Sequence, residues 1–221
     1  MTPARRQAPL LTLAAFLAGL GFGCGDSDKI GSTSANEAVP AESGPLHARI
    51  ETARGNIRFK LRPDAAPISC ANFVNLVDRG FYDGLKFHRH SRVIRQTGNP
   101  YNDDEMRWSP GYTLLPEFSP DLRFDVGGRV AMVRVNQDPA SPVRPTEFFL
   151  TTKPQSERFT FVYPIFGEVV EGQDVVDAIQ IDDVMDRIVI EGDPRALIER
   201  HRDLVDSWNR QLDRSEFTKR P

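Results

Sequence analysis

The sequence predicts a mainly β fold in which an antiparallel sheet closes, or nearly closes, on itself. Between residues 46 and 191, short runs rich in β-branched and aromatic side chains are separated by Gly, Pro and Asp, and few stretches have helical spacing. With 221 residues and 39% hydrophobic side chains, the chain is long enough for one domain with a buried core and extensions at its ends.

The N-terminal 23 residues have the order of a secretory signal. Arg5 and Arg6 precede an apolar run from residue 10 to residue 20, which is shorter than the roughly 20 residues of a membrane-spanning helix. Cys24 directly follows small residues, which resembles a bacterial lipoprotein signal. We therefore expect Cys24 to carry lipid and to begin a mature, exported chain on the periplasmic side of the cell envelope. An ordinary cleaved signal and an uncleaved anchor are the alternatives.

Residues 24–45 are rich in Ser, Gly, Ala and Glu without an apolar period, which is typical of a flexible tether. The domain is expected to span residues 46–193 and to open with a hairpin over residues 46–61. Apolar residues alternate on both sides of a predicted turn at residues 54–56.

Residues 67–78 have the apolar spacing of a helix that Pro67 begins and Gly80 ends. Cys70 lies on its apolar face and is expected to be a small buried hydrophobe without a disulfide partner. Asn72 and Asn75 are expected to face outward or to cap the helix locally.

The rest of the domain is predicted to be mostly strands. After an irregular region over residues 101–111 and a segment over 112–118, the pattern predicts the strands 129–135, 147–152, 161–170 and 187–191, and a short helix over 174–179.

Residues 194–221 form a charged extension in which Leu197, Leu204, Trp208 and Leu212 recur at helical spacing after Asp193 and Pro194. This pattern predicts an amphipathic helix that packs on its own domain. A helix that binds a partner or a membrane surface is the alternative.

Composition bears on the partners. The net charge of −3, without a basic stripe that has interleaved aromatic residues, argues against nucleic acid as a partner.

His88 and His90 could be two metal ligands, but no third ligand follows at a recognisable spacing, so neither a metal nor a cofactor is expected. The chain is expected to be a monomer.

The stretch that carries the chemistry is FYDGLKFHRHSRVIRQTGNP, residues 81–100. It sets Arg89 and Gln96 among the apolar residues Phe87, Val93 and Ile94. Neither polar group is a nucleophile, so the pattern indicates a groove that binds and polarises a ligand without covalent chemistry.

Residues 63–89, PDAAPISCANFVNLVDRGFYDGLKFHR, closely resemble the opening of bacterial cyclophilins. The agreement continues through Gln96 and Gly98, through PGYT at 110–113 and through FGEVVEGQDVVDAI at 166–179. The resemblance implies an eight-stranded antiparallel β-barrel capped by two helices, here with an added C-terminal amphipathic helix. It also implies peptidyl-prolyl cis/trans isomerase activity on proline-containing polypeptides. With the expected N-terminal signal, these substrates would be exported proteins.

The resemblance also implies roles for single residues. Arg89 matches the catalytic arginine, whose guanidinium can hold the substrate carbonyl and donate toward the prolyl nitrogen as the amide twists. The implied substrate-binding positions are His88, Val93, Ile94, Gln96, Met132, Val133, Arg134, Val135, Glu147, Phe149, Phe159 and Tyr163.

Three departures from the family pattern lie in this groove. The chain between Phe87 and Gln96 is one residue shorter, Val133-Arg134-Val135 replaces Ala-Asn-Ala, and Glu147 replaces a glutamine. If Glu147 pairs with Arg134, Arg89 stays free for catalysis. If Glu147 instead pairs with Arg89, the protein becomes a weak isomerase or a non-catalytic peptide-binding chaperone.

Overall fold

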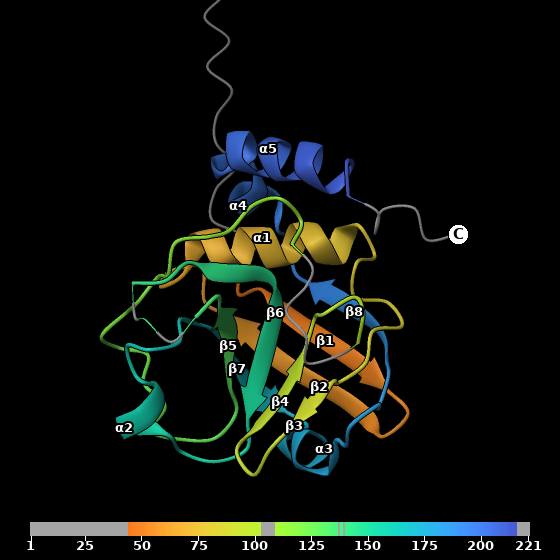
Figure 1. The fold of residues 1–221 in the computed structure, drawn as a ribbon, viewed down its shortest axis with the longest axis vertical. Helices are drawn as coiled ribbons and strands as arrows, with labels where there is room; N and C mark the ends of the chain where they lie inside the picture. Colours follow the sequence, from red (N-terminus) through yellow and green to blue (C-terminus); the bar gives the residue numbers. More distant parts are fainter. Residues whose placement is uncertain (1–43, 103–108, 137, 139, 216–221) are drawn as a thin grey trace, which may run out of the picture. The chain divides into compact units, whose positions relative to one another are not determined.

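The computed structural model describes residues 44–102, 109–136, 138 and 140–215. The predicted signal, Cys24 and most of the predicted tether lie outside these ranges. Within them, eight strands form one antiparallel sheet, which confirms the predicted mainly β architecture (Figure 1). In the order along the sheet they are β3 (Arg89–His90), β4 (Ile94–Thr97), β6 (Val143–Thr151), β5 (Arg129–Arg134), β7 (Ile165–Glu171), β2 (Gly55–Leu61), β1 (His47–Thr52) and β8 (Met185–Glu191).

The two ends of this sheet are joined by the segment that leads into β3. The backbone N–H of Gly84 donates to the carbonyl of Met185 at 2.8 Å, and that of Met185 donates to Leu85 at 2.8 Å. One step further, the N–H of Phe87 donates to the carbonyl of Asp183 at 2.9 Å. The segment before β3 therefore runs along the start of β8, and the sheet curls back on itself.

Strand boundaries differ from the prediction at three places. The β1–β2 turn is formed by Ala53 and Arg54, earlier than expected. Strand β6 starts at Val143, four residues before the predicted start, because a bulge in its ladder admits Pro145. Strand β7 starts later than predicted because Phe161 has a φ of 59°, a left-handed conformation that a strand does not admit.

The helix α1 (Pro67–Asp78) has the predicted bounds, but the prediction for Asn72 and Asn75 was wrong. Both asparagines are buried: Asn72 Nδ2 donates to the carbonyl of Pro145 at 2.6 Å, and Asn75 Nδ2 donates to Asn209 at 3.0 Å. The apolar period marks only the face turned to the barrel, whereas the opposite face of α1 is also covered. The helix α3 (Gln173–Ala178) agrees with its prediction to within a residue, and α2 (Ser156–Phe159) was not predicted.

The first turn of α1 is capped by a carboxylate from a distant loop. Glu117 Oε1 accepts from the backbone N–H of Ile68 at 2.9 Å, and Oε2 accepts from the N–H and the hydroxyl of Ser69 at 2.8 and 2.7 Å. The helix has no cap from its own preceding residue, so Glu117 satisfies N–H groups that the helix cannot pair itself.

The core is filled by aromatic rings in edge-on or tilted contact. Phe73 lies at its centre, with ring centroids of Phe59, Tyr82, Phe148 and Phe166 at 5.3 to 5.6 Å.

Cys70 is fully buried among this core, where its thiol donates to the Phe166 carbonyl at 3.4 Å. Burial raises the pKa of this thiol, so it remains protonated and unreactive in the folded chain, in agreement with the prediction of a buried hydrophobe.

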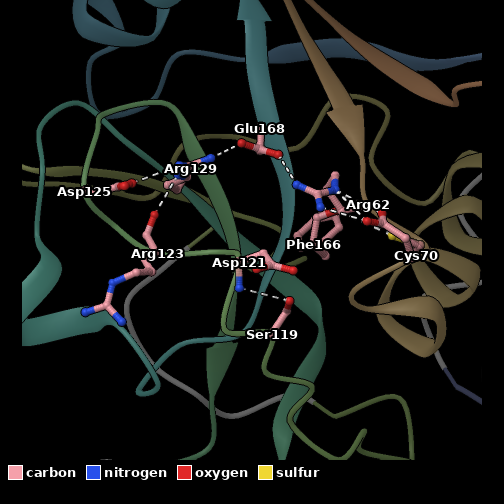
Figure 2. A network of polar contacts seen from close by, with 10 residues as sticks. Arg62, Cys70, Ser119, Asp121, Arg123, Asp125, Arg129, Phe166 and Glu168 are labelled. Carbon is pink, nitrogen blue, oxygen red and sulfur yellow. Dashed lines mark hydrogen bonds and ion pairs between the residues drawn. The ribbon is translucent and has the colours of Figure 1, made fainter.

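Charged side chains form a network on the outside of the sheet, shown in Figure 2. Glu168 accepts from Arg62 on one side and from Arg129 on the other. Arg129 also donates to the carbonyl of Arg123 at 2.8 Å and to the carboxylate of Asp125 at 2.9 Å. The network therefore fixes the loop that contains Arg123 and Asp125 against the sheet.

The predicted C-terminal helix is present as two helices, α4 (Arg195–Arg200) and α5 (Arg202–Leu212), with a break at His201. The break changes the helical phase, so Val205 is 6% exposed while Leu204, expected on the apolar face, is 42% exposed. Both helices pack against α1 on the side away from the barrel (Figure 1). None of the described helices has the length and apolar character needed to cross a membrane.

We expect Glu117→Ala to lower the free energy of unfolding by about 1–2 kcal/mol, because the first turn of α1 loses its cap. Urea denaturation followed by circular dichroism measures this change. Glu157→Ala, which removes an exposed carboxylate from the first turn of α2, is the control and should change stability by less than about 0.5 kcal/mol. Equal effects of the two substitutions would contradict the role of Glu117.

Candidate active site

Arg89 and Gln96 face each other across the hairpin of β3 and β4. Their Cα atoms are register partners, and Arg89 Nη1 donates to Gln96 Oε1 at 3.4 Å. Arg89 is exposed, whereas Gln96 is buried. The guanidinium therefore lies at the surface with a buried amide behind it.

The short loop of this hairpin is fixed by its own polar groups. Ser91 N–H donates to the carbonyl of Ile94 at 3.1 Å, and Ser91 Oγ accepts from the N–H groups of Val93 and Ile94 at 3.2 Å each. Arg95 donates to the Ser91 carbonyl at 2.7 Å and, from its other nitrogen, to the carbonyl of Asp177 at 2.8 Å. The loop is thus tight and tied to α3.

An apolar cluster lies beside the hairpin, where the resemblance puts the proline pocket. Phe149 on β6 is the register partner of Gln96 and is 2% exposed. The ring of Tyr163 meets it edge-on at 5.1 Å, and that of Phe159 lies at 5.9 Å. One cluster contains six of the predicted apolar positions: Val93, Ile94, Val133, Phe149, Phe159 and Tyr163. The structure therefore brings together the apolar wall that the resemblance implied.

Phe124 belongs to the same cluster and was missed. Its fully buried ring stacks on Phe149 at 6.2 Å and meets Phe159 edge-on at 5.5 Å. It lies in an irregular loop, so no apolar period marks it. Arg129 holds Arg123 and Asp125, the residues on both sides of Phe124, so the network in Figure 2 fixes the backbone from which this ring enters the cluster.

Three predicted positions lie elsewhere than the pocket. Met132 is fully buried in the main core because its side chain faces the opposite side of β5 from Val133, so the structure does not bring its side chain together with the apolar cluster. Val135 directly follows β5 and is 39% exposed. The side chain of His88 is buried behind Gln96, with its Nε2 atom 3.3 Å from Gln96 Nε2.

Glu147 is buried beside Gln96 and takes neither of the two expected arginines as its partner in the described part of the chain. Its Oε2 accepts from Gln96 Nε2 at 2.9 Å, and its Oε1 accepts from Arg144 Nη1. Arg134 instead places its guanidinium over the ring of Tyr163, 5.1 Å from the centroid.

A bulge in β6 makes this pairing possible. Strand β5 pairs Met132 with Phe148 but Arg134 with Val143, so β6 has additional residues between these two pairs. In a regular strand, Arg144 and Glu147 would face opposite sides. The bulge turns both toward the same buried site, and the proline at 145 was the only sequence signal for it.

The carboxylate of Glu147 determines how Gln96 is oriented. A carboxylate only accepts hydrogen bonds, so the NH₂ group of Gln96 turns toward Glu147 and its oxygen turns toward Arg89. The site consequently places an exposed guanidinium, an oriented amide oxygen and an aromatic cluster side by side. Among the described residues, no group of three or more His, Cys, Asp or Glu side chains could hold a metal ion.

Comparisons with known proteins agree on one family. A family model described as cyclophilin type peptidyl-prolyl cis-trans isomerase/CLD matches residues 47–196. Peptidyl-prolyl cis-trans isomerase B of Bacillus subtilis is 33% identical over 137 residues, which cover 62% of this chain and 91% of that protein. Peptidyl-prolyl cis-trans isomerase A of Dickeya dadantii is 29% identical over 143 residues, covering 63% and 73%.

A crystal structure of a cyclophilin type peptidyl-prolyl cis-trans isomerase from Cryptosporidium parvum superposes with a TM-score of 0.60 at 25% identity. The superposition covers 68% of this chain and 99% of that one.

We expect Arg144→Met to lower the free energy of unfolding by about 3 kcal/mol, because it leaves the charge of Glu147 buried without its arginine. The double variant Arg144→Met/Glu147→Gln removes that charge and should recover part of the loss. Urea denaturation of the wild type and these two variants measures both effects. A double variant less stable than Arg144→Met would contradict the pairing.

Proposed function

Because the chain belongs to the cyclophilin-type peptidyl-prolyl cis-trans isomerase family, we propose that it catalyses isomerisation of X-Pro bonds with Arg89 as the catalytic residue. The observation that carries this proposal is the exposed guanidinium of Arg89 beside the oriented amide of Gln96, at the pocket floored by Phe149.

The reaction needs no covalent step. An X-Pro bond resists rotation because of its partial double-bond character, with a barrier of about 18–20 kcal/mol, and exchanges in tens of seconds or more. A catalyst stabilises the twisted amide more than either planar form. Arg89 can hold the substrate carbonyl and donate toward the prolyl nitrogen as that atom loses conjugation.

The other groups hold the substrate. The proline ring enters the apolar pocket between Phe149, Phe159 and Tyr163. The Gln96 oxygen accepts from the substrate backbone with the lone pair that its long, 3.4 Å hydrogen bond from Arg89 does not use. Residues 133–135 at the end of β5 pair with the extended peptide.

The partner of Glu147 favours an active enzyme over a quenched one. A quenched site requires Glu147 to neutralise Arg89, whereas in the structure Arg144 provides the compensating charge for this carboxylate. A non-catalytic chaperone is therefore the less favoured function, and the activity measurement below distinguishes it from an isomerase.

The N-terminal pattern extends the proposal to location. A signal over residues 1–23 and a lipid on Cys24 would anchor the enzyme to the cell envelope, with residues 24–45 as its tether. Its substrates would be proline-containing segments of exported polypeptides, on which it would act as a monomer without a cofactor.

We expect Arg89→Ala to lower kcat/KM for a prolyl tetrapeptide by about 100-fold, because one transition-state donor is lost. NMR line-shape analysis of the peptide measures the rate of cis/trans exchange that the enzyme catalyses, from which the change in kcat/KM is obtained. Arg92→Ala, at an exposed arginine in the turn of the same hairpin, is the matched control and should retain activity near the wild-type level. If the wild type binds the peptide but is no faster than Arg89→Ala, the protein is a peptide-binding chaperone.

For the N-terminus, we expect the chain expressed in a bacterium with radiolabelled palmitate to incorporate label and to sediment with membranes, whereas Cys24→Ser does neither. Cleavage without label would indicate an ordinary signal, and an uncleaved, unlabelled chain would indicate a retained anchor. Either result would overturn the lipid assignment without touching the activity.

A further inference from the structure

Helix α5 lies beyond the residues that the family model matches, yet an unbroken chain of contacts runs from it to the candidate site. The ring of Trp208 on α5 stacks on Tyr112, with centroids 5.8 Å apart and planes 19° from parallel. The Tyr112 hydroxyl donates to Asn72 Oδ1 at 2.8 Å, and Asn72 Nδ2 donates to the carbonyl of Pro145 at 2.6 Å.

Pro145 lies within the bulge of β6 that carries Arg144 and Glu147. The backbone of this bulge is also closely packed against Gly98. A Cβ atom added to Gly98 would lie 2.0 Å from the carbonyl oxygen of Thr146, so the chain passes too close there for any other residue. The close approach of Gly98, the hydrogen bond from Asn72 to Pro145 and a 3.2 Å hydrogen bond from the Tyr82 hydroxyl to the Thr146 carbonyl together restrict how far the bulge can move.

Each side chain in this series of contacts is held in a defined orientation. Burial raises the pKa of Tyr112, so its hydroxyl remains protonated and acts as the donor to Asn72. That bond turns the oxygen of the Asn72 amide toward Tyr112 and its NH₂ group toward Pro145. Asn72 is fully buried and Trp208 nearly so, which leaves little room for other rotamers.

We propose that α5 positions the active site through Trp208, Tyr112 and Asn72. Trp208 holds the ring of Tyr112, whose hydroxyl orients Asn72, and Asn72 fixes the bulge from which Glu147 reaches Gln96. Glu147 in turn sets the oxygen of Gln96 toward Arg89. The three are positioning residues, and their assignment rests on the proposed isomerase function of the site.

A simpler role for α5 would be to cover the outer face of α1. Two other contacts serve that role and lead away from the bulge: Asn75 donates to Asn209 at 3.0 Å, and Arg79 pairs with Asp213 at 2.5 Å. Loss of the Arg79–Asp213 pair therefore weakens the attachment of α5 and leaves the contacts from Trp208 to Pro145 unchanged. Asp213→Asn is the matched control.

The decisive variant is Tyr112→Phe, which removes the hydroxyl and keeps the ring against Trp208. We expect kcat/KM for a prolyl peptide to fall about 5- to 10-fold, while Asp213→Asn changes it less than 2-fold. In the Glu147→Gln background, Tyr112→Phe should cause little further loss, since it acts through Glu147.

A second readout does not depend on activity. The side-chain amide resonances of Gln96 should shift in Tyr112→Phe and stay in place in Asp213→Asn. If the wild type lacks isomerase activity, the proposed function fails, yet these shifts still test the positioning. Trp208→Leu, at the other end of the chain, should move the same resonances if Tyr112→Phe does not fold. Unmoved Gln96 resonances, or equal losses of activity in Tyr112→Phe and Asp213→Asn, would overturn the inference.

Discussion

The buried carboxylate of Glu147 is the constraint from which the arrangement of the site follows. A carboxylate removed from water is costly unless it is paired and hydrogen-bonded, and here Arg144 and Gln96 supply those partners. Because Arg144 would face away in a regular strand, β6 must leave its ladder locally. The bulge, the required glycine at 98 and the fixed amide of Gln96 are consequences of meeting this one electrostatic demand.

Elements with a local apolar period could be predicted closely from the sequence. The first hairpin and α1 have nearly the expected bounds, because alternation and helical spacing are properties of neighbouring residues. The break at His201 could not be read in this way, since Leu197 and Leu204 fit one continuous helix equally well. Asn72 was misplaced because its surroundings come from residues more than 30 positions away in the chain.

In the candidate site, too, single positions could be predicted from the sequence, whereas contacts between distant residues could not. The resemblance placed Phe149, Phe159 and Tyr163 in one pocket because each motif match concerns a single position. It could not supply the partner of Glu147, because that pairing depends on a bulge in β6. It could not supply Phe124 either, because Phe124 lies in an irregular loop whose position is set by the ion pair of Asp125 with Arg129. Nor could a motif match show which face of β5 each residue takes, which puts Met132 in the main core and Val133 in the cluster with Phe149.

The closure of the sheet has a consequence for the order of folding. Lys86 and Asp182, which pair where the segment before β3 meets the start of β8, are 96 residues apart in the chain. A contact at that separation forms only after the intervening loop has lost much of its conformational freedom. The Arg89 hairpin directly follows this segment, so the position of its guanidinium depends on residues that lie about 90 positions later in the chain. A nascent chain that ends before residue 182 would expose the pocket without closing the sheet.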